Sequence, residues 1–104
     1  MENELAYLSG VFDGEGSFGY WSKGKDKNKE FRISLSMSDS DVVLRFLIYF
    51  KKGSITVRIP EDKNHKTLYH WRVCHDKGKE IIRSMLPYLS KRRQAKFQDE
   101  MHKG

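Results

Sequence analysis

The fold of this chain is predicted mainly by one stretch near its N-terminus, Leu8-Ser9-Gly10-Val11-Phe12-Asp13-Gly14-Glu15-Gly16. Apolar residues recur there at three- and four-residue spacing, which predicts one face of an α-helix formed by Leu5, Leu8, Val11 and Phe12. A second stripe, Ala6, Gly10 and Gly14, consists of small residues only. Because glycine weakens a helix by about 1 kcal/mol relative to alanine, we expect another helix to approach this stripe closely.

Two carboxylates, Asp13 and Glu15, fall at the C-terminal end of this predicted helix. The helix macrodipole disfavours negative charge at that end, which makes both groups candidate ligands for a cation. Taken alone, the segment 13–16 is also typical of a turn. The helical pattern before it and the organisation of the remaining chain favour the cation-binding interpretation.

Residues 8–16 resemble the LAGLIDADG motif of homing endonucleases, position for position and without a gap. The resemblance implies that the helix packs through its small residues against the same helix of a second copy. The implied interface residues are Ala6, Ser9, Gly10, Asp13 and Gly14. It also implies a divalent cation, Mg²⁺ or another such as Mn²⁺, bound by the Glu15 carboxylate and the Gly14 carbonyl oxygen.

The composition is that of a basic chain of 104 residues, with 20 Lys and Arg against 14 Asp and Glu, net charge +6 and pI near 9.5. This excess favours a polyanionic partner, nucleic acid before an acidic membrane surface. The length predicts one domain, residues 1–104. With a single cysteine, no signal-peptide pattern and no apolar run of membrane-spanning length, we expect a soluble intracellular protein without a membrane partner.

Residue patterns beyond the motif predict two β-hairpins. The first joins strands 17–23 and 31–37 through a charged turn, 24–29, and in the second strand the odd positions are apolar and the even ones polar. The second hairpin joins strands 54–59 and 67–74.

Helices are predicted after each hairpin. Asp39 and its neighbours supply side-chain oxygens for the start of a helix at 42–50, with Gly53 as its C-cap. A turn at 76–78 precedes a helix at 81–86 that ends near Pro87. A basic helix over 90–102 has three apolar anchors, Ala95, Phe97 and Met101.

This order predicts an α+β fold, a four-stranded antiparallel sheet with helices on one face. It matches the αββαββα core that the LAGLIDADG resemblance implies, so the resemblance covers nearly the whole chain. A second, weaker family-like segment spans residues 86–95 and contains Lys91, for which the family implies a role in stabilising charge or organising water at the catalytic site. The run Lys91-Arg92-Arg93 allows the alignment with the family to shift by one residue. The competing interpretation of this run is a basic helix start exposed to solvent.

Strand parity predicts which side chains form the face of the sheet away from the helices, and the resemblance adds the first strand. The expected DNA-contacting residues are Gly19, Trp21, Lys23, Arg32, Ser34, Ser36, Ser54, Thr56, Arg58, Leu68, His70 and Arg72. A two-stranded ribbon fits the major groove of DNA, where such side chains contact base edges. The segment 23–29 and Lys63, His65 and Lys66 suit phosphate contacts, although each could be a solvated turn residue.

Two further residue groups have competing interpretations. The resemblance aligns Asp39 with a polar residue that orders solvent near the metal ions, but N-capping of its helix explains it more simply. His70, Cys74 and His75 do not have zinc-like spacing, since alternate residues of a strand point to opposite faces. Cys74 is therefore expected to be inert.

These observations favour a homodimeric, divalent-metal-dependent endonuclease that cuts a long, near-palindromic double-stranded DNA site and has no small-molecule substrate. One motif per chain requires a second copy, and a two-fold protein predicts a two-fold site. The resemblance places such enzymes on mobile genetic elements. A binding-only relative, such as a maturase-like RNA binder or a regulator, shares the fold and the basic face. A basic protein-interaction domain without nucleic acid is the third alternative.

Overall fold

The structure is a computed structural model that describes residues 2–22 and 29–103. These residues form four α-helices, one 3-10 turn and four strands. In chain order they are α1 (Glu2–Glu15), β1 (Gly16–Ser22), β2 (Lys29–Met37), α2 (Ser40–Phe50), β3 (Ser54–Arg58), β4 (Leu68–Cys74), α3 (His75–Met85), η1 (Leu86–Tyr88) and α4 (Lys91–Lys103). The predicted α+β class and the predicted order of helices and hairpins are confirmed.

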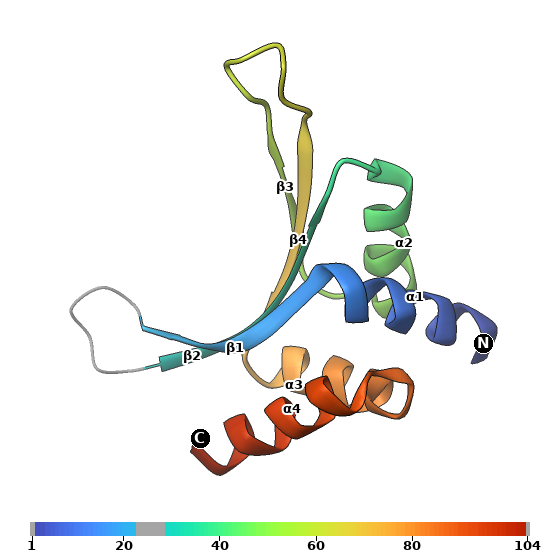
Figure 1. The fold of residues 1–104 in the computed structure, drawn as a ribbon, viewed down its shortest axis with the longest axis vertical. Coiled ribbons are helices and arrows are strands. Elements are labelled where there is room, and N and C mark those ends of the chain that lie inside the picture. Colours follow the sequence, from blue (N-terminus) through green and yellow to red (C-terminus); the bar gives the residue numbers. More distant parts are fainter. Residues whose placement is uncertain (1, 23–28, 104) are drawn as a thin grey trace.

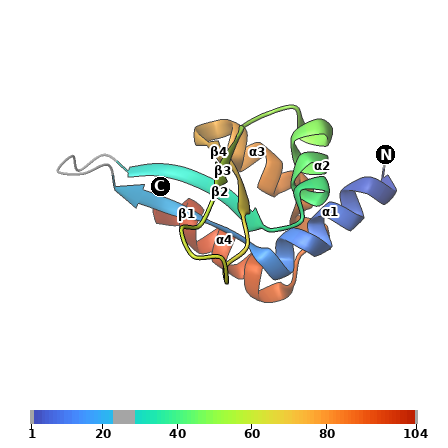
Figure 2. The same ribbon diagram turned by 90° about the horizontal axis from the view of Figure 1, so that it is seen from above.

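The four strands form one antiparallel sheet in the order β1-β2-β4-β3. In Figure 1 the β3–β4 hairpin extends upward and the β1–β2 hairpin to the left, while the helices lie on the other side of the sheet. In the view from above, α1 and α2 lie at the right and the β1–β2 hairpin extends to the left (Figure 2). One face of the sheet is therefore covered and the other is left free.

The core lies between the sheet and the helices and follows the predicted parity. Phe31, Ile33 and Leu35 of β2 are buried, as are Leu8 and Phe12 of α1. The rings of Phe12, Phe18, Phe31 and Phe97 pack with centroids 6.1–6.5 Å apart, and such pairs add about 0.5–1.5 kcal/mol each beyond their buried area. Trp71 is fully buried, and its Nε1–H donates to the Lys52 carbonyl at 3.0 Å.

The prediction of a separate turn at 76–78 is wrong, because these residues belong to the first turn of α3. The chain reverses instead at His75, which has a left-handed φ of 61°. A Cβ on Gly78 would lie 3.0 Å from the Val73 carbonyl oxygen, so this glycine allows α3 to begin directly against the end of β4.

The predicted C-cap of α2 is also wrong. Lys51, with φ of 57°, takes the left-handed cap position, and its N–H bonds to the Leu47 carbonyl at 2.8 Å. Gly53 has φ of 93° and lies where a Cβ would be 2.6 Å from the Arg72 carbonyl oxygen. Its role is close approach to β4 rather than helix capping.

Several expected details differ by smaller amounts. Asp39 occupies the N-cap position of α2, but only its carbonyl accepts helical hydrogen bonds, and its side chain makes no cap bond. Ala95 is exposed rather than an apolar anchor, whereas Phe97 is buried as expected. Lys29 is the first residue of β2 instead of part of the turn, and the rest of that turn lies outside the described residues.

Candidate nucleic-acid interface and metal site

The free face of the sheet carries polar side chains that line up across the strands. The register places Ser17, Ser34, Arg72 and Ser54 in one row. Ser36, His70 and Thr56 form the next row, and Leu68 pairs with Arg58 beyond it. The structure thus brings the predicted residues of β2, β3 and β4 together on one continuous surface.

Six of these side chains line a groove of about 250 Å³, namely Ser36, Thr56, Arg58, Leu68, His70 and Arg72. Within it, Ser36 Oγ and His70 Nδ1 are 2.5 Å apart. Burial lowers the pKa of His70, and the positive charges of Arg72 and Arg58 lower it further. His70 is therefore neutral at neutral pH, and Arg58 and Arg72 carry the positive charge of the groove.

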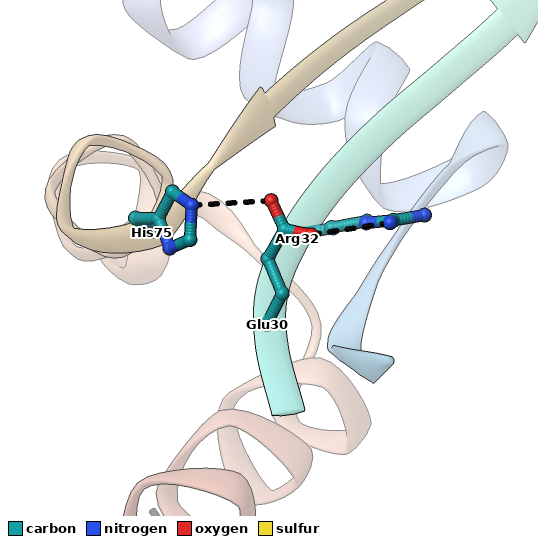
Figure 3. A network of polar contacts seen from close by, with 3 residues as sticks. All are labelled: Glu30, Arg32 and His75. Carbon is teal, nitrogen blue, oxygen red and sulfur yellow. Dashed lines mark hydrogen bonds and ion pairs between the residues drawn. The ribbon is translucent and has the colours of Figure 1, made fainter. Parts of the chain in front are cut away.

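An acidic residue that the sequence reasoning missed, Glu30, lies on the same face. It is 8% exposed, and its carboxylate contacts Arg32 Nη2 at 3.1 Å and His75 Nε2 at 3.2 Å (Figure 3). The alternation of β2, which puts even positions outward, could have predicted that Glu30 lies on this face. In the register Glu30 lies opposite Trp21. Arg32, a predicted DNA contact, is thus already paired within the chain.

The first strand contributes less free surface than expected. Trp21 is 40% exposed, but Gly19 is buried, and a Cβ there would lie 3.7 Å from the Trp21 ring and 3.9 Å from the Glu100 carboxylate. Lys23 and the rest of the predicted phosphate-contacting segment, 23–28, lie outside the described residues. Lys63, His65 and Lys66 are exposed in the β3–β4 connection.

The small-residue stripe of α1 lies on its outer side. Gly10 and Gly14 are exposed, and a Cβ at either position would meet nothing within 4 Å among the described atoms. Ala6 is half-buried beside them. Ser9 was expected at the interface, but it is fully buried with Leu8 and Phe12 on the inward side of the helix. Its hydroxyl has no hydrogen-bond partner among the described residues.

Glu15 is the last residue of α1 and is exposed. The final carbonyls of a helix have no partners within it, so the Glu15 carboxylate and the Gly14 carbonyl offer two oxygen donors at one helix end. Such a set suits a hard cation such as Mg²⁺, which keeps several water ligands. Within residues 2–22 and 29–103 no three acidic, histidine or cysteine groups converge on one point.

The start of α4 is fixed to the end of α1 by reciprocal caps. Ser90 Oγ accepts from the Arg93 N–H at 3.4 Å, and the Ser90 N–H donates to Asp13 Oδ1 at 3.0 Å. In return, Arg93 Nη2 donates to the Asp13 carbonyl at 3.2 Å. This arrangement resembles a capping box whose carboxylate comes from another helix. It places Lys91, which is exposed and adjacent to Ser90, beside the C-terminal end of α1.

These contacts also set the charge state of Asp13. The hydrogen bond from the Ser90 backbone lowers its pKa, helped by the Ser90 side chain and the positive charges of Arg93 and Arg92. Asp13 thus has a defined intrachain partner, whereas Glu15, two residues later, points to solvent.

His70, Cys74 and His75 do not converge on one point among the described residues. His70 contacts Ser36, and His75 contacts Glu30. Burial raises the pKa of the Cys74 thiol, and hydrogen bonding to Glu30 raises it further, which disfavours the thiolate.

In the described part of the chain, no helix is long and apolar enough to cross a membrane.

A family model described as a LAGLIDADG-like domain matches residues 2–101. Among solved structures, the homing endonuclease I-CvuI in complex with the I-CreI target is similar with a TM-score of 0.69 and 20% identity, over 93% of this chain and 65% of that one. The LAGLIDADG meganuclease I-CpaMI bound to uncleaved DNA has a TM-score of 0.70 and 20% identity, over 90% and 33%. The LAGLIDADG homing endonuclease I-GzeII in complex with its DNA target has a TM-score of 0.61 and 26% identity, over 81% and 28%.

The chain therefore spans less than two thirds of the length of these similar structures. One I-CvuI complex was solved in the presence of 2 mM Mg with its DNA not cleaved, and another with its target in the presence of 2 mM Ca. No curated protein matches the chain in sequence.

Proposed function

The chain belongs to the LAGLIDADG-like domain family, and on that premise we propose that it is a site-specific endonuclease, acting on double-stranded DNA as a homodimer with a divalent cation. The observation that carries this proposal is the position of Glu15. Its exposed carboxylate ends the helix whose outer stripe, Gly10 and Gly14, is open for a second copy. Two copies related by a two-fold axis along that stripe would bring two Glu15 carboxylates together.

The donor set fits a divalent cation. Glu15 and the Gly14 carbonyl supply oxygen ligands, and the second copy would supply the same pair. A cation held there would supply activation of a water molecule and stabilisation of the negative charge that develops on the phosphate oxygens during hydrolysis. Lys91, held beside the end of α1 by the Ser90–Asp13 contact, would place a further positive charge near that phosphate.

The free face of the sheet supports DNA as the substrate. Arg58 and Arg72 are exposed, positively charged, and lie on adjacent antiparallel strands. Strands are about 5 Å apart and the major groove is about 12 Å wide, so the β3–β4 ribbon fits into it. The two-fold axis predicts a near-palindromic site, with one ribbon on each half. The proposed complex needs no small-molecule substrate.

Cleavage of a selected DNA site tests the catalytic part. We expect Glu15→Gln to reduce cleavage at least a hundredfold in Mg²⁺, while DNA affinity measured in Ca²⁺ stays within about threefold of wild type. Glu80→Gln, an exposed substitution on α3 that removes the same charge, is the matched control and should cleave normally. Equal cleavage by wild type and Glu15→Gln would refute the assignment of Glu15.

A binding-only protein of this family is the second candidate function. The observation that favours it is the ion pair of Arg32 with Glu30, which engages one predicted DNA contact within the chain. The same experiment separates the two functions. A protein that selects a DNA or RNA sequence but cleaves nothing with Mg²⁺ or Mn²⁺, whether or not Glu15 is present, has the binding-only function.

A further inference from the structure

The groove on the free face of the sheet presents hydrogen-bond donors with few acceptors. The guanidinium groups of Arg58 and Arg72 only donate, and none of the six lining residues carries a carboxylate or an amide side chain. Leu68 is apolar, and the hydroxyl of Thr56 can rotate to donate. The two remaining side chains, Ser36 and His70, contact each other, and His70 can act as a donor or as an acceptor.

Ser36 is the hydrogen-bond partner of one nitrogen of His70. The two residues are partners in the β2–β4 register, and Ser36 Oγ lies 2.5 Å from His70 Nδ1. His70 is half-buried between Arg58 on β3 and Arg72 on its own strand, and both positive charges disfavour the imidazolium form. A neutral imidazole has one N–H, and the hydrogen bond made by one nitrogen determines the role of the other.

We propose that the Ser36 hydroxyl donates to His70 Nδ1, so that Nε2 keeps its hydrogen and the groove, lined by donors, selects guanine in the DNA major groove. Guanine presents two neighbouring acceptors there, N7 and O6. Adenine presents an acceptor beside an amino group, and the amino group of cytosine is a donor, so both would place a donor against the donors of the protein. Each half-site is expected to contain guanine where this groove contacts it.

This inference rests on the proposed DNA-binding function and deepens it by naming the base. It is tested by selecting bound sequences from a randomised double-stranded DNA library, and then measuring relative affinities for the selected site and its single-base changes. Wild type should prefer guanine at one position of each half-site. His70→Gln should reduce that preference about tenfold and favour adenine, because a glutamine amide pairs with adenine N6 and N7.

Ser36→Ala should weaken the same guanine preference severalfold without changing preferences at other positions. The matched controls are Ser84→Ala on α3 and His102→Gln on α4, two substitutions of the same types away from the sheet. In the free protein, ¹⁵N NMR should show His70 protonated at Nε2 in wild type, and a mixture of tautomers in Ser36→Ala.

Two results would overturn the inference. One is a wild-type tautomer with the proton on Nδ1. The other is a selected site with the same base preferences in His70→Gln, Ser36→Ala and both controls, which leaves the proposed function intact. If wild type selects no sequence at all, the proposed DNA-binding function fails together with this inference. Loss of cleavage alone, as in Glu15→Gln, affects neither the selection nor the tautomer.

Discussion

At the scale of single residues, Asp13 has a role that its place in the motif does not suggest. Its carboxylate accepts the Ser90 N–H, and its carbonyl accepts from Arg93, so one residue satisfies a free donor of α4 and a free carbonyl of α1. The sequence suggested a ligand or interface residue because two carboxylates stood together. The structure separates them, with Asp13 turned to its own chain and Glu15 to solvent.

The lowered pKa of Asp13 predicts acid sensitivity. A carboxyl whose pKa is lower in the folded than in the unfolded chain stabilises the fold above its unfolded pKa, near 4, and this contribution is lost as the pH falls through the folded value. We expect Asp13→Asn to unfold more easily at pH 6 and to lose less stability than wild type between pH 5 and pH 3. Urea unfolding across this range measures both effects. Asp76→Asn, whose side chain is 95% exposed, is the control for the removal of a surface carboxylate.

We expect removal of the Glu30 charge to change the salt dependence of DNA binding. It is an acidic group on a basic face and pairs with Arg32 at 3.1 Å, so Arg32 is less available to DNA phosphate. In Glu30→Gln the face gains one unit of positive charge. If Arg32 then contacts a phosphate, the slope of log affinity against log salt concentration should steepen by about 0.9 for non-specific DNA. Fluorescence titration at several salt concentrations measures this slope, and an unchanged slope would show that Arg32 is not free to make the contact.

At the scale of elements, the C-terminus of α2 carries avoidable strain. Lys51 adopts a left-handed conformation that costs a residue with a side chain roughly 1 kcal/mol and costs glycine little. Lys51→Gly should therefore raise the free energy of unfolding by about 1 kcal/mol and the melting temperature by about 4–8 °C. Lys52→Gly is the control, since Lys52 has no positive φ and glycine should not stabilise the chain there. Equal effects of the two substitutions on the melting temperature would contradict this account.

The strands were predictable from the sequence because their pattern has a period of two. Phe31, Ile33 and Leu35 alternate with polar residues, and burial on one face fixes the register. The starts and ends of helices were less predictable. Gly53 and the segment 76–78 carry turn-forming residues, but their glycines serve close approach to β4, which depends on contacts between residues far apart in the sequence.

Some features of the candidate site were likewise predictable from the sequence and others were not. Parity alone identified Arg58, His70 and Arg72 as neighbours on one face, because each strand contributes every second residue. The pairing of Glu30 with His75 could not be predicted, since it depends on α3 beginning immediately after β4 with a left-handed residue. Likewise, the position of Lys91 depends on a contact between residues 13 and 90, for which the sequence gives no local signal.

At the scale of the whole molecule, two surfaces differ in chemical character. The open side of the sheet is polar and carries Arg58 and Arg72, whereas the outer side of α1 carries the exposed Gly10 and Gly14, beside which a Cβ would meet nothing within 4 Å among the described atoms. Tyr7 and Leu44, both exposed, add apolar area on α1 and α2. A second copy on this helical side would leave both sheets free, so dimerisation and DNA binding do not compete.

We therefore expect a larger residue at position 10 to have opposite effects on folding stability and on dimerisation. Because a Cβ at this position meets nothing within 4 Å in the described residues, Gly10→Ala should stabilise an isolated chain by about 1 kcal/mol through helix propensity alone. The same methyl group would separate two helices that approach through glycine, so dimerisation should weaken, and Gly10→Leu should abolish it. Urea unfolding at low concentration measures the first effect and sedimentation equilibrium the second, with Ala95→Leu, an exposed substitution on α4, as the control for added apolar surface. A wild type that stays monomeric at all concentrations would contradict the paired Glu15 carboxylates on which the proposed cleavage mechanism rests.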